Sequence, residues 1–252
     1  MGALADFTRR RHIGFPLLSD PDSEIIRRFG LLNPEYEPGN VAHGVPYPAT
    51  FVVDRQGVVK ERYAEEGYPY RRTAASILTL QGANAGRILG ERRAKLFGLR
   101  LAASNAEVYP GQRITLVTEL DLDEGLHAYA PGDHRYRALE LVLHADPVVT
   151  LHETVRPEAH DYYFAPLKET VPVFEGRVRL LTDVTLGDGR ALRELLSLPD
   201  PVVVISGELR YQVCSKSVCH PPSAEPVEWR LPVRAFDRDR VPEDLRRTPQ
   251  RH

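Results

Sequence analysis

The chain contains 252 residues, of which 42% are hydrophobic and 27% are charged. These proportions are typical of soluble globular domains and argue against wholesale disorder. The formal net charge is −2, so the clustered basic charge of a nucleic-acid-binding surface is not indicated. No apolar run approaches the roughly 18–20 residues of a membrane-spanning helix. Two cysteines are too few for a disulfide-dense scaffold or a four-cysteine zinc site.

The first residues do not have the order of an export signal, in which basic residues precede an apolar stretch. Here the basic cluster Arg9–Arg11 comes after the apolar residues, and Pro16 follows soon after. We therefore expect no signal peptide in the sequence as given.

The first hundred residues mix helical and strand patterns. Asp20 followed by Pro21 is typical of a helix start, and the apolar residues at 25–29 recur at helical spacing. The short apolar run at 50–54 predicts a buried strand, and residues 58–63 predict its partner in a hairpin. A second helix is expected at 72–80. We predict an α/β segment over residues 1–83 and a linker helix over 84–98.

From residue 99 onward, the dominant pattern alternates apolar and polar residues, as half-buried strands do. This alternation is found at 114–120, 139–143, 178–184, 209–213 and 227–233. Several short strands separated by polar turns predict an all-β sandwich or barrel over 99–236, with a short helix or crossover at 190–198. A flexible tail is expected over 237–252.

The two cysteines lie five positions apart, between one alternating strand and the start of the next. Residues that face each other across antiparallel strands have Cα atoms about 4.5–5.5 Å apart. Disulfides prefer Cα separations of about 4.4–6.8 Å, so Cys214 and Cys219 could form a bridge without large backbone movement. Strict alternation places Cys214 on the face of Arg210 and Gln212, which predicts a position at the rim.

Three interpretations of this pair stay open on the residues alone. An exchangeable dithiol is favoured because a short loop adds little chain-entropy stabilisation, and because Lys216 and His220 could favour a thiolate. The alternatives are an inert structural disulfide or two buried free thiols. A metal site formed by Cys214, Cys219 and His220 lacks an evident fourth ligand.

The cysteine segment reads Tyr-Gln-Val-Cys at 211–214 and Cys-His-Pro-Pro at 219–222. It resembles the N-terminal domain of the thiol:disulfide interchange protein DsbD, a family with Tyr-Gln-x-Cys and Cys-Tyr-Pro-Pro elements. The resemblance extends over residues 99–235 and includes the segments 125–129 and 160–164. His220 departs from the family pattern, because it replaces the usual aromatic residue.

The resemblance implies an immunoglobulin-like sandwich in which Cys214 and Cys219 are the catalytic redox couple. It also implies aromatic or histidine side chains that cap or line the dithiol: Tyr129, Tyr163, Phe164, Tyr211 and His220. The implied partners are thioredoxin-like or other thiol–disulfide proteins in the periplasm or another extracytoplasmic compartment. We expect no cofactor, no metal and no membrane span.

The segment Phe15–Pro21, followed by a helix, and the segment Gly44–Gly57 resemble the C-terminal half of an AhpC/TSA peroxiredoxin, which is a thioredoxin-like fold. This second resemblance extends over residues 7–80, and Pro48 is the candidate for the cis-proline of such folds. The family's reactive cysteine lies upstream of the matched part, and no cysteine precedes Cys214. We therefore expect no peroxidase activity from this segment. An incomplete sheet also predicts self-association through its exposed edges.

The leading hypothesis is a truncated thioredoxin-like segment followed by a sandwich that exchanges disulfides with partner proteins. One alternative is a non-catalytic binding module with a structural disulfide. Another is a fragment of a longer peroxiredoxin-type antioxidant enzyme whose peroxidatic cysteine is missing here.

Overall fold

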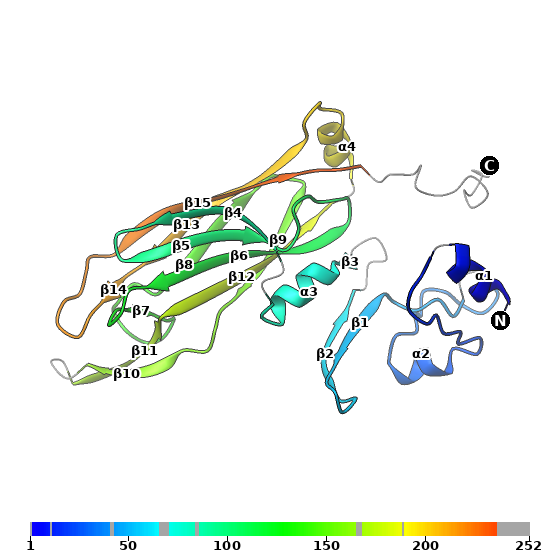
Figure 1. Cartoon of the computed structure of the whole chain (residues 1–252), viewed down its shortest axis with the longest axis horizontal. Helices are drawn as coiled ribbons and strands as arrows, with labels where there is room; N and C mark the ends of the chain where they lie inside the picture. Colours follow the sequence, from blue (N-terminus) through cyan, green and yellow to red (C-terminus); the bar gives the residue numbers. More distant parts are fainter. Residues whose placement is uncertain are drawn as a thin grey trace. The chain divides into compact units, whose positions relative to one another are not determined.

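A computed structural model describes residues 2–10, 12–40, 43–65, 71–83, 86–164, 168–187 and 189–235 (Figure 1). The chain divides into two compact units, Met1–Arg71 and Arg72–His252. The boundary therefore lies before the expected end of the first segment at residue 83. The helix expected at 72–80 belongs to the second unit, because its residues bond to that unit's strands: Ser76 Oγ lies 2.7 Å from Thr115 Oγ1.

The first unit contains two short helices and a hairpin. Its elements are α1 (Gly2–Arg10), α2 (Glu24–Arg28), β1 (Ala49–Val53) and β2 (Val59–Ala64). The carboxylate of Asp20 accepts the backbone N–H groups of Glu24 and Ile26, so the expected helix starts three residues later than Pro21. The predicted hairpin is confirmed, since β1 and β2 pair antiparallel.

Pro48 immediately precedes β1, at the place expected for the thioredoxin-like cis-proline. None of the described peptide bonds is cis, so the expectation of a cis form at Pro48 is wrong for this structure. The carbonyl of Pro48 accepts the backbone N–H of Glu65, which extends the hairpin ladder with the ordinary trans bond. The role of Pro48 as the equivalent position stays a prediction.

The larger sheet of the second unit has the strand order β4-β5-β6-β12-β9. Its strands are β4 (Arg87–Arg93), β5 (Phe97–Ala103), β6 (Gln112–Leu122), β12 (Arg177–Leu186) and β9 (Val149–Val155). The predicted linker helix over 84–98 is wrong, because residues 87–93 form β4 and pair with β5. Pairing with a neighbouring strand outweighs a weak local helical pattern. The short β3 (Arg71–Arg72) belongs to the same sheet through its pairing with β6, and helix α3 (Ala74–Leu80) follows it in the chain.

A second sheet completes the predicted sandwich. Its strands are β15 (Ser223–Pro232), β13 (Val202–Tyr211) and β8 (Glu140–Ala145), in that order. Alternate residues of β5 and of the second half of β15 are buried. Trp229 is fully buried in the core, and its indole N–H donates to the carbonyl of Ala102 at 3.0 Å. The two sheets are thus joined by apolar packing and by a direct hydrogen bond. The helix α4 (Arg190–Leu196) confirms the short helix expected near 190–198.

A buried ionic network anchors the start of the second unit. Arg72 Nη2 donates to Asp183 Oδ2 at 2.5 Å, and Arg113 Nη2 donates to the same oxygen at 3.1 Å. Thr115 Oγ1 donates to Asp183 Oδ1 at 2.7 Å. Burial opposes ionisation of Asp183, but the hydrogen bonds from Arg72 and Thr115 outweigh it and hold the pKa of Asp183 below its usual value.

A small sheet lies at the end of the sandwich away from α4 (Figure 1). Its strands, in order, are β10 (His160–Phe164), β11 (Glu169–Glu175), β7 (His127–Tyr129) and β14 (Val213–Cys214). The chain therefore leaves one sheet at the end of β13 and enters another at β14. No described helix is long and apolar enough to cross a membrane. The expected tail over 237–252 lies outside the described residues.

Candidate functional site

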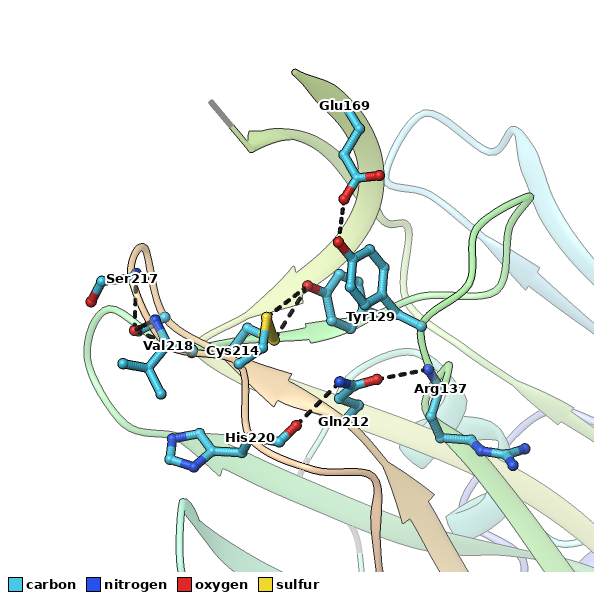
Figure 2. The surroundings of a disulfide bond; sticks show 11 residues. Tyr129, Arg137, Glu169, Gln212, Cys214, Ser217, Val218 and His220 are labelled. Carbon is cyan, nitrogen blue, oxygen red and sulfur yellow. Dashed lines mark hydrogen bonds between the residues drawn. A yellow bond between two sulfur atoms is a disulfide. The ribbon is translucent and has the colours of Figure 1, made fainter. Parts of the chain in front are cut away.

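The two cysteines close a very small hairpin at the end of β14. Cys214 and Cys219 form an isolated antiparallel bridge, and the backbone N–H of His220 donates to the carbonyl of Val213 at 3.0 Å. Within the turn, the Ser215 hydroxyl accepts the backbone N–H of Val218 at 3.0 Å (Figure 2). The loop is thus ordered by its own polar groups, as expected for a tight connection between strands.

Cys214 and Cys219 form a disulfide, and their Cα atoms are 4.1 Å apart. The two residues differ sharply in exposure: Cys214 is fully buried at 0%, whereas Cys219 is exposed to solvent. The rim position expected for Cys214 is therefore wrong. Alternation fails there because β13 ends at Tyr211 and the chain enters the small sheet after Gln212, where Val213 and Cys214 are both buried in β14.

The Tyr129 hydroxyl lies beside both sulfurs (Figure 2). It donates to Cys214 Sγ at 3.3 Å and lies 3.5 Å from Cys219 Sγ. Tyr129 is 2% exposed, and its ring stacks on Tyr136 with centroids 4.1 Å apart and an interplanar angle of 3°. The predicted lining residue therefore makes direct hydrogen-bonding contact with the disulfide.

A second tyrosine and a carboxylate support this contact. The Tyr136 hydroxyl donates to Glu169 at the start of β11. Burial, and then the neighbouring Tyr136 and Glu169, raise the pKa of Tyr129 above its usual range. The pKa of Tyr136 is raised by burial and by its hydrogen bond to Glu169. Both hydroxyls consequently keep their protons at neutral pH and act as hydrogen-bond donors.

His127 occupies the position of β7 that pairs with Cys214. It is 2% exposed, and its ring lies 4.4 Å from the ring of Tyr162 and 5.5 Å from that of Tyr129. Burial lowers the pKa of His127, with Glu175 acting in the opposite direction. Cys214 belongs to a small apolar cluster with Tyr129, Val171 and Val173, against which Tyr136 and Tyr162 pack.

Gln212 connects the two loops that flank the disulfide. Its Nε2 donates to the carbonyl of His220 at 3.1 Å, and its Oε1 accepts the backbone N–H of Arg137 at 3.0 Å (Figure 2). The glutamine of the Tyr-Gln-x-Cys element therefore fixes the cysteine loop against the segment that carries Tyr136.

The structure separates the other predicted cap residues. Tyr163 is 61% exposed, whereas its neighbour Tyr162 packs against the cluster that contains Cys214. Phe164 is half-buried and is not part of that cluster. Along a strand, adjacent side chains point to opposite faces, so Tyr162 and Tyr163 cannot both face the dithiol. The structure therefore places Tyr162, and not Tyr163, against the cluster that contains Cys214.

The remaining two predicted lining residues lie beside the cysteine loop without facing the sulfurs. Tyr211 belongs to the main sandwich core, where its ring meets Phe97 edge-on at 4.9 Å. The backbone of His220 holds the loop, and its ring points away from the disulfide in Figure 2. Tyr136 and Glu169 were not identified as site residues from the sequence, because neither lies in one of the motifs that resemble the family.

This geometry permits attack on one sulfur and protects the other. Cys219 is exposed, whereas Cys214 is buried in the cluster that contains Tyr129 and Tyr162. Disulfides exchange by attack of a thiolate on one sulfur with departure of the other. The arrangement therefore suits a reaction in which Cys219 is attacked and Cys214 is the leaving group.

Comparison with known families matches both parts of the chain. The family described as "Thiol:disulfide interchange protein DsbD, N-terminal" matches residues 100–230, which is just over half of the chain. The AhpC/TSA family matches residues 2–62. No curated protein matches the chain.

Among solved structures, the chain is similar to the reduced N-terminal domain of DsbD from Neisseria meningitidis, with 14% identity and a TM-score of 0.34 over 54% of this chain and 91% of that chain. It is also similar to the N-terminal periplasmic domain of ScsB from Proteus mirabilis, with 15% identity and a TM-score of 0.37 over 58% and 51%. The GAE domain of GGA2p from Saccharomyces cerevisiae matches with 9% identity and a TM-score of 0.33, over 59% and 97%.

The sandwich with its cysteine hairpin and the family match over residues 100–230 agree. The preceding segment is similar to the AhpC/TSA family over residues 2–62. The chain belongs to the family of the N-terminal domain of the thiol:disulfide interchange protein DsbD.

Proposed function

We propose that this protein exchanges disulfides with partner proteins through Cys214 and Cys219. The observation that carries the proposal is the unequal exposure of a bridged pair, with Cys219 open to solvent and Cys214 buried at 0%. A bridge that served only to hold strands together would gain little here, because so short a loop contributes about 2 kcal/mol in the chain-entropy model.

The reaction begins when a partner thiolate attacks Cys219 Sγ. The Cys214–Cys219 bond breaks, a mixed disulfide forms between the partner and Cys219, and Cys214 leaves as a thiolate. The second thiolate of the partner then attacks the partner's first sulfur in the mixed disulfide. This step closes the partner's disulfide and releases Cys219 as a thiolate. The partner dithiol becomes a disulfide, this protein becomes a dithiol, and the reverse sequence passes the electrons on.

Thioredoxin-like proteins are the proposed partners. The exposed side of the hairpin presents Val218, which is 54% exposed, beside Cys219. A small apolar surface next to a reactive sulfur offers a partner both contact area and access to the bond to be broken.

Alkylation of the folded chain before and after graded reductant tests this function. We expect both cysteines to become reactive while the protein stays folded. We also expect a reduction potential between about −300 and −120 mV, the range of biological dithiols. Cysteines that resist reduction until urea unfolds the sandwich would show a structural disulfide and refute the proposal.

A further inference from the structure

The Tyr129 hydroxyl is a polar group in a place where the simplest exchange mechanism requires none. It lies among the rings that bury Cys214, and it donates to Cys214 Sγ at 3.3 Å. Buried polar groups are nearly always hydrogen-bonded, and here the bridged sulfurs are the partners. A hydroxyl whose bonding partner is one of the reacting atoms is a candidate for a chemical role.

We propose that Tyr129 is a catalytic residue of the exchange, because its hydroxyl stabilises the Cys214 sulfur as a thiolate when the bridge opens. This inference rests on the proposed function and adds a named group to it. In the step concerned, the electron pair of the broken S–S bond moves onto Cys214 Sγ, and the Tyr129 O–H already points at that atom. No proton is transferred, and the bond strengthens as the sulfur gains charge.

The need for a donor follows from the burial of Cys214. An unpaired thiolate in an apolar cluster is strongly disfavoured, because charge is costly to remove from water. Cys219 is exposed, so its own thiolate is solvated without help. The asymmetry in exposure thus makes a protein donor necessary at one sulfur only.

The surroundings hold the Tyr129 hydroxyl in place before the reaction. The backbone N–H of Leu139 donates to the Tyr129 carbonyl at 2.7 Å, and Tyr129 pairs with Val173 of β11. On one face of its ring lies Tyr136, which Glu169 fixes by a hydrogen bond. A donor already aimed at the atom where charge develops needs no reorganisation in the transition state.

The proton remains on Tyr129 throughout. Burial raises the pKa of Tyr129 above its usual range. A hydroxyl with a raised pKa holds its proton more tightly than an ordinary tyrosine does, so it donates to the Cys214 sulfur without losing that proton. Tyr129 therefore acts as a hydrogen-bond donor and not as a general acid.

The test replaces Tyr129 by phenylalanine, which keeps the ring and its stacking but removes the hydroxyl. A hydrogen bond to a charged group is among the stronger ones, so we expect dithiothreitol to reduce the Tyr129→Phe bridge about tenfold more slowly than the wild-type bridge. In the reduced protein, the pKa of Cys214, followed by thiolate absorbance, should rise by about one unit.

Two further variants separate the hydroxyl from packing. Tyr136→Phe loses the bond to Glu169 but retains the stacked ring, and it should slow reduction by no more than about threefold. Tyr109→Phe removes another carboxylate-bonded hydroxyl, that of Tyr109 to Glu107. Tyr109 lies next to Val108, which bonds to Pro232 at the opposite end of β15 from the cysteine loop, and its loss should leave the rate unchanged.

The outcomes distinguish this inference from the function on which it rests. If the wild-type disulfide resists every reductant in the folded state, both the proposed disulfide exchange and the role of Tyr129 are refuted. If the wild-type disulfide cycles and the Tyr129→Phe disulfide is reduced within twofold of the wild-type rate, only the role of Tyr129 is refuted. Equal losses in Tyr129→Phe and Tyr136→Phe would also overturn it, because a hydroxyl that does not contact either sulfur would then matter as much as the one that does. If Tyr129→Phe does not fold, the Tyr136→Phe rate decides: a loss of about tenfold or more refutes the inference.

Discussion

Replacement of Asp183 by asparagine tests the buried network at the start of the second unit. The substitution keeps an oxygen for the hydroxyl of Thr115 but removes the charge that faces Arg72 and Arg113. The side chain of Arg72 is 7% exposed and that of Asp183 is 11% exposed, so Arg72 would lose this charged partner where little water can replace it. Loss of one partner from a buried pair typically costs about 3–5 kcal/mol.

The Arg113 side chain moderates this cost. It is 23% exposed and can recover some hydration, so we expect a loss near the lower limit, about 3 kcal/mol in the free energy of unfolding. For a urea dependence of about 2 kcal/mol per molar, the midpoint should fall by about 1.5 M. A loss of this size leaves a typical domain folded at neutral pH.

Trp229 makes the measurement specific for the sandwich, because it is the single tryptophan of the sequence and is fully buried in that core. Its fluorescence followed through urea unfolding reports the second unit alone. The matched control is Asp123→Asn, which breaks an exposed pair with Arg93 and should cost less than about 1 kcal/mol. A midpoint for Asp183→Asn no lower than that of the control would refute the reasoning.

The pH dependence supplies a second check with a defined sign. The folded-state pKa of Asp183 lies below its usual value. Its contribution to stability is therefore fully present above the unfolded-state pKa of about 3.9, and it is lost as the pH falls through the folded-state value. The difference between wild type and Asp183→Asn should accordingly shrink below about pH 4.

Three further predictions concern the cysteine site. Cys214→Ser should leave Cys219 open to maleimide in the folded protein, whereas Cys219→Ser should leave Cys214 at least about tenfold slower to react; equal rates would contradict the asymmetry in burial. Gln212→Ala should lower the free energy of unfolding by about 2 kcal/mol and hasten reduction of the bridge, and Gln212→Glu, which keeps the bond from the Arg137 N–H, should be less affected. Because burial lowers the pKa of His127, stability should decline as the pH falls below about 6.5, and a urea midpoint in His127→Phe that declines equally would contradict this.

The period-two patterns of the sequence predicted the sandwich because its strands each bury one face. In β15, Val227, Trp229 and Leu231 are buried while the residues between them are not fully covered. The same reasoning failed over residues 84–98, where the apolar residues are few and β4 has no fully buried residue. The strand β4 is held by its pairing with β5 and not by a buried face. Its residues therefore lack the alternation of apolar and polar side chains that identifies a strand in the sequence.

The sequence predicted the parts of the site that lie within one strand or motif, but not the parts that depend on how strands and loops pack together. The motif identified the cysteines and Tyr129, but the exposure of Cys214 depends on a change of sheet after Tyr211. Alternation describes one sheet and cannot anticipate that change. Tyr136 lies in an irregular loop, and its position follows from stacking on a residue of β7, which no local pattern encodes.

In the proposed exchange, the unequal burial of Cys214 and Cys219 decides which cysteine is attacked. If both cysteines were exposed, a partner could form the mixed disulfide with either of them. Burial of Cys214 under Tyr129 and Tyr162 restricts attack to Cys219, but it would also make Cys214 a poor leaving group. The hydroxyl of Tyr129 removes that conflict, because it supplies a donor where solvent is excluded. Selective access and a competent leaving group therefore depend on the same aromatic cluster.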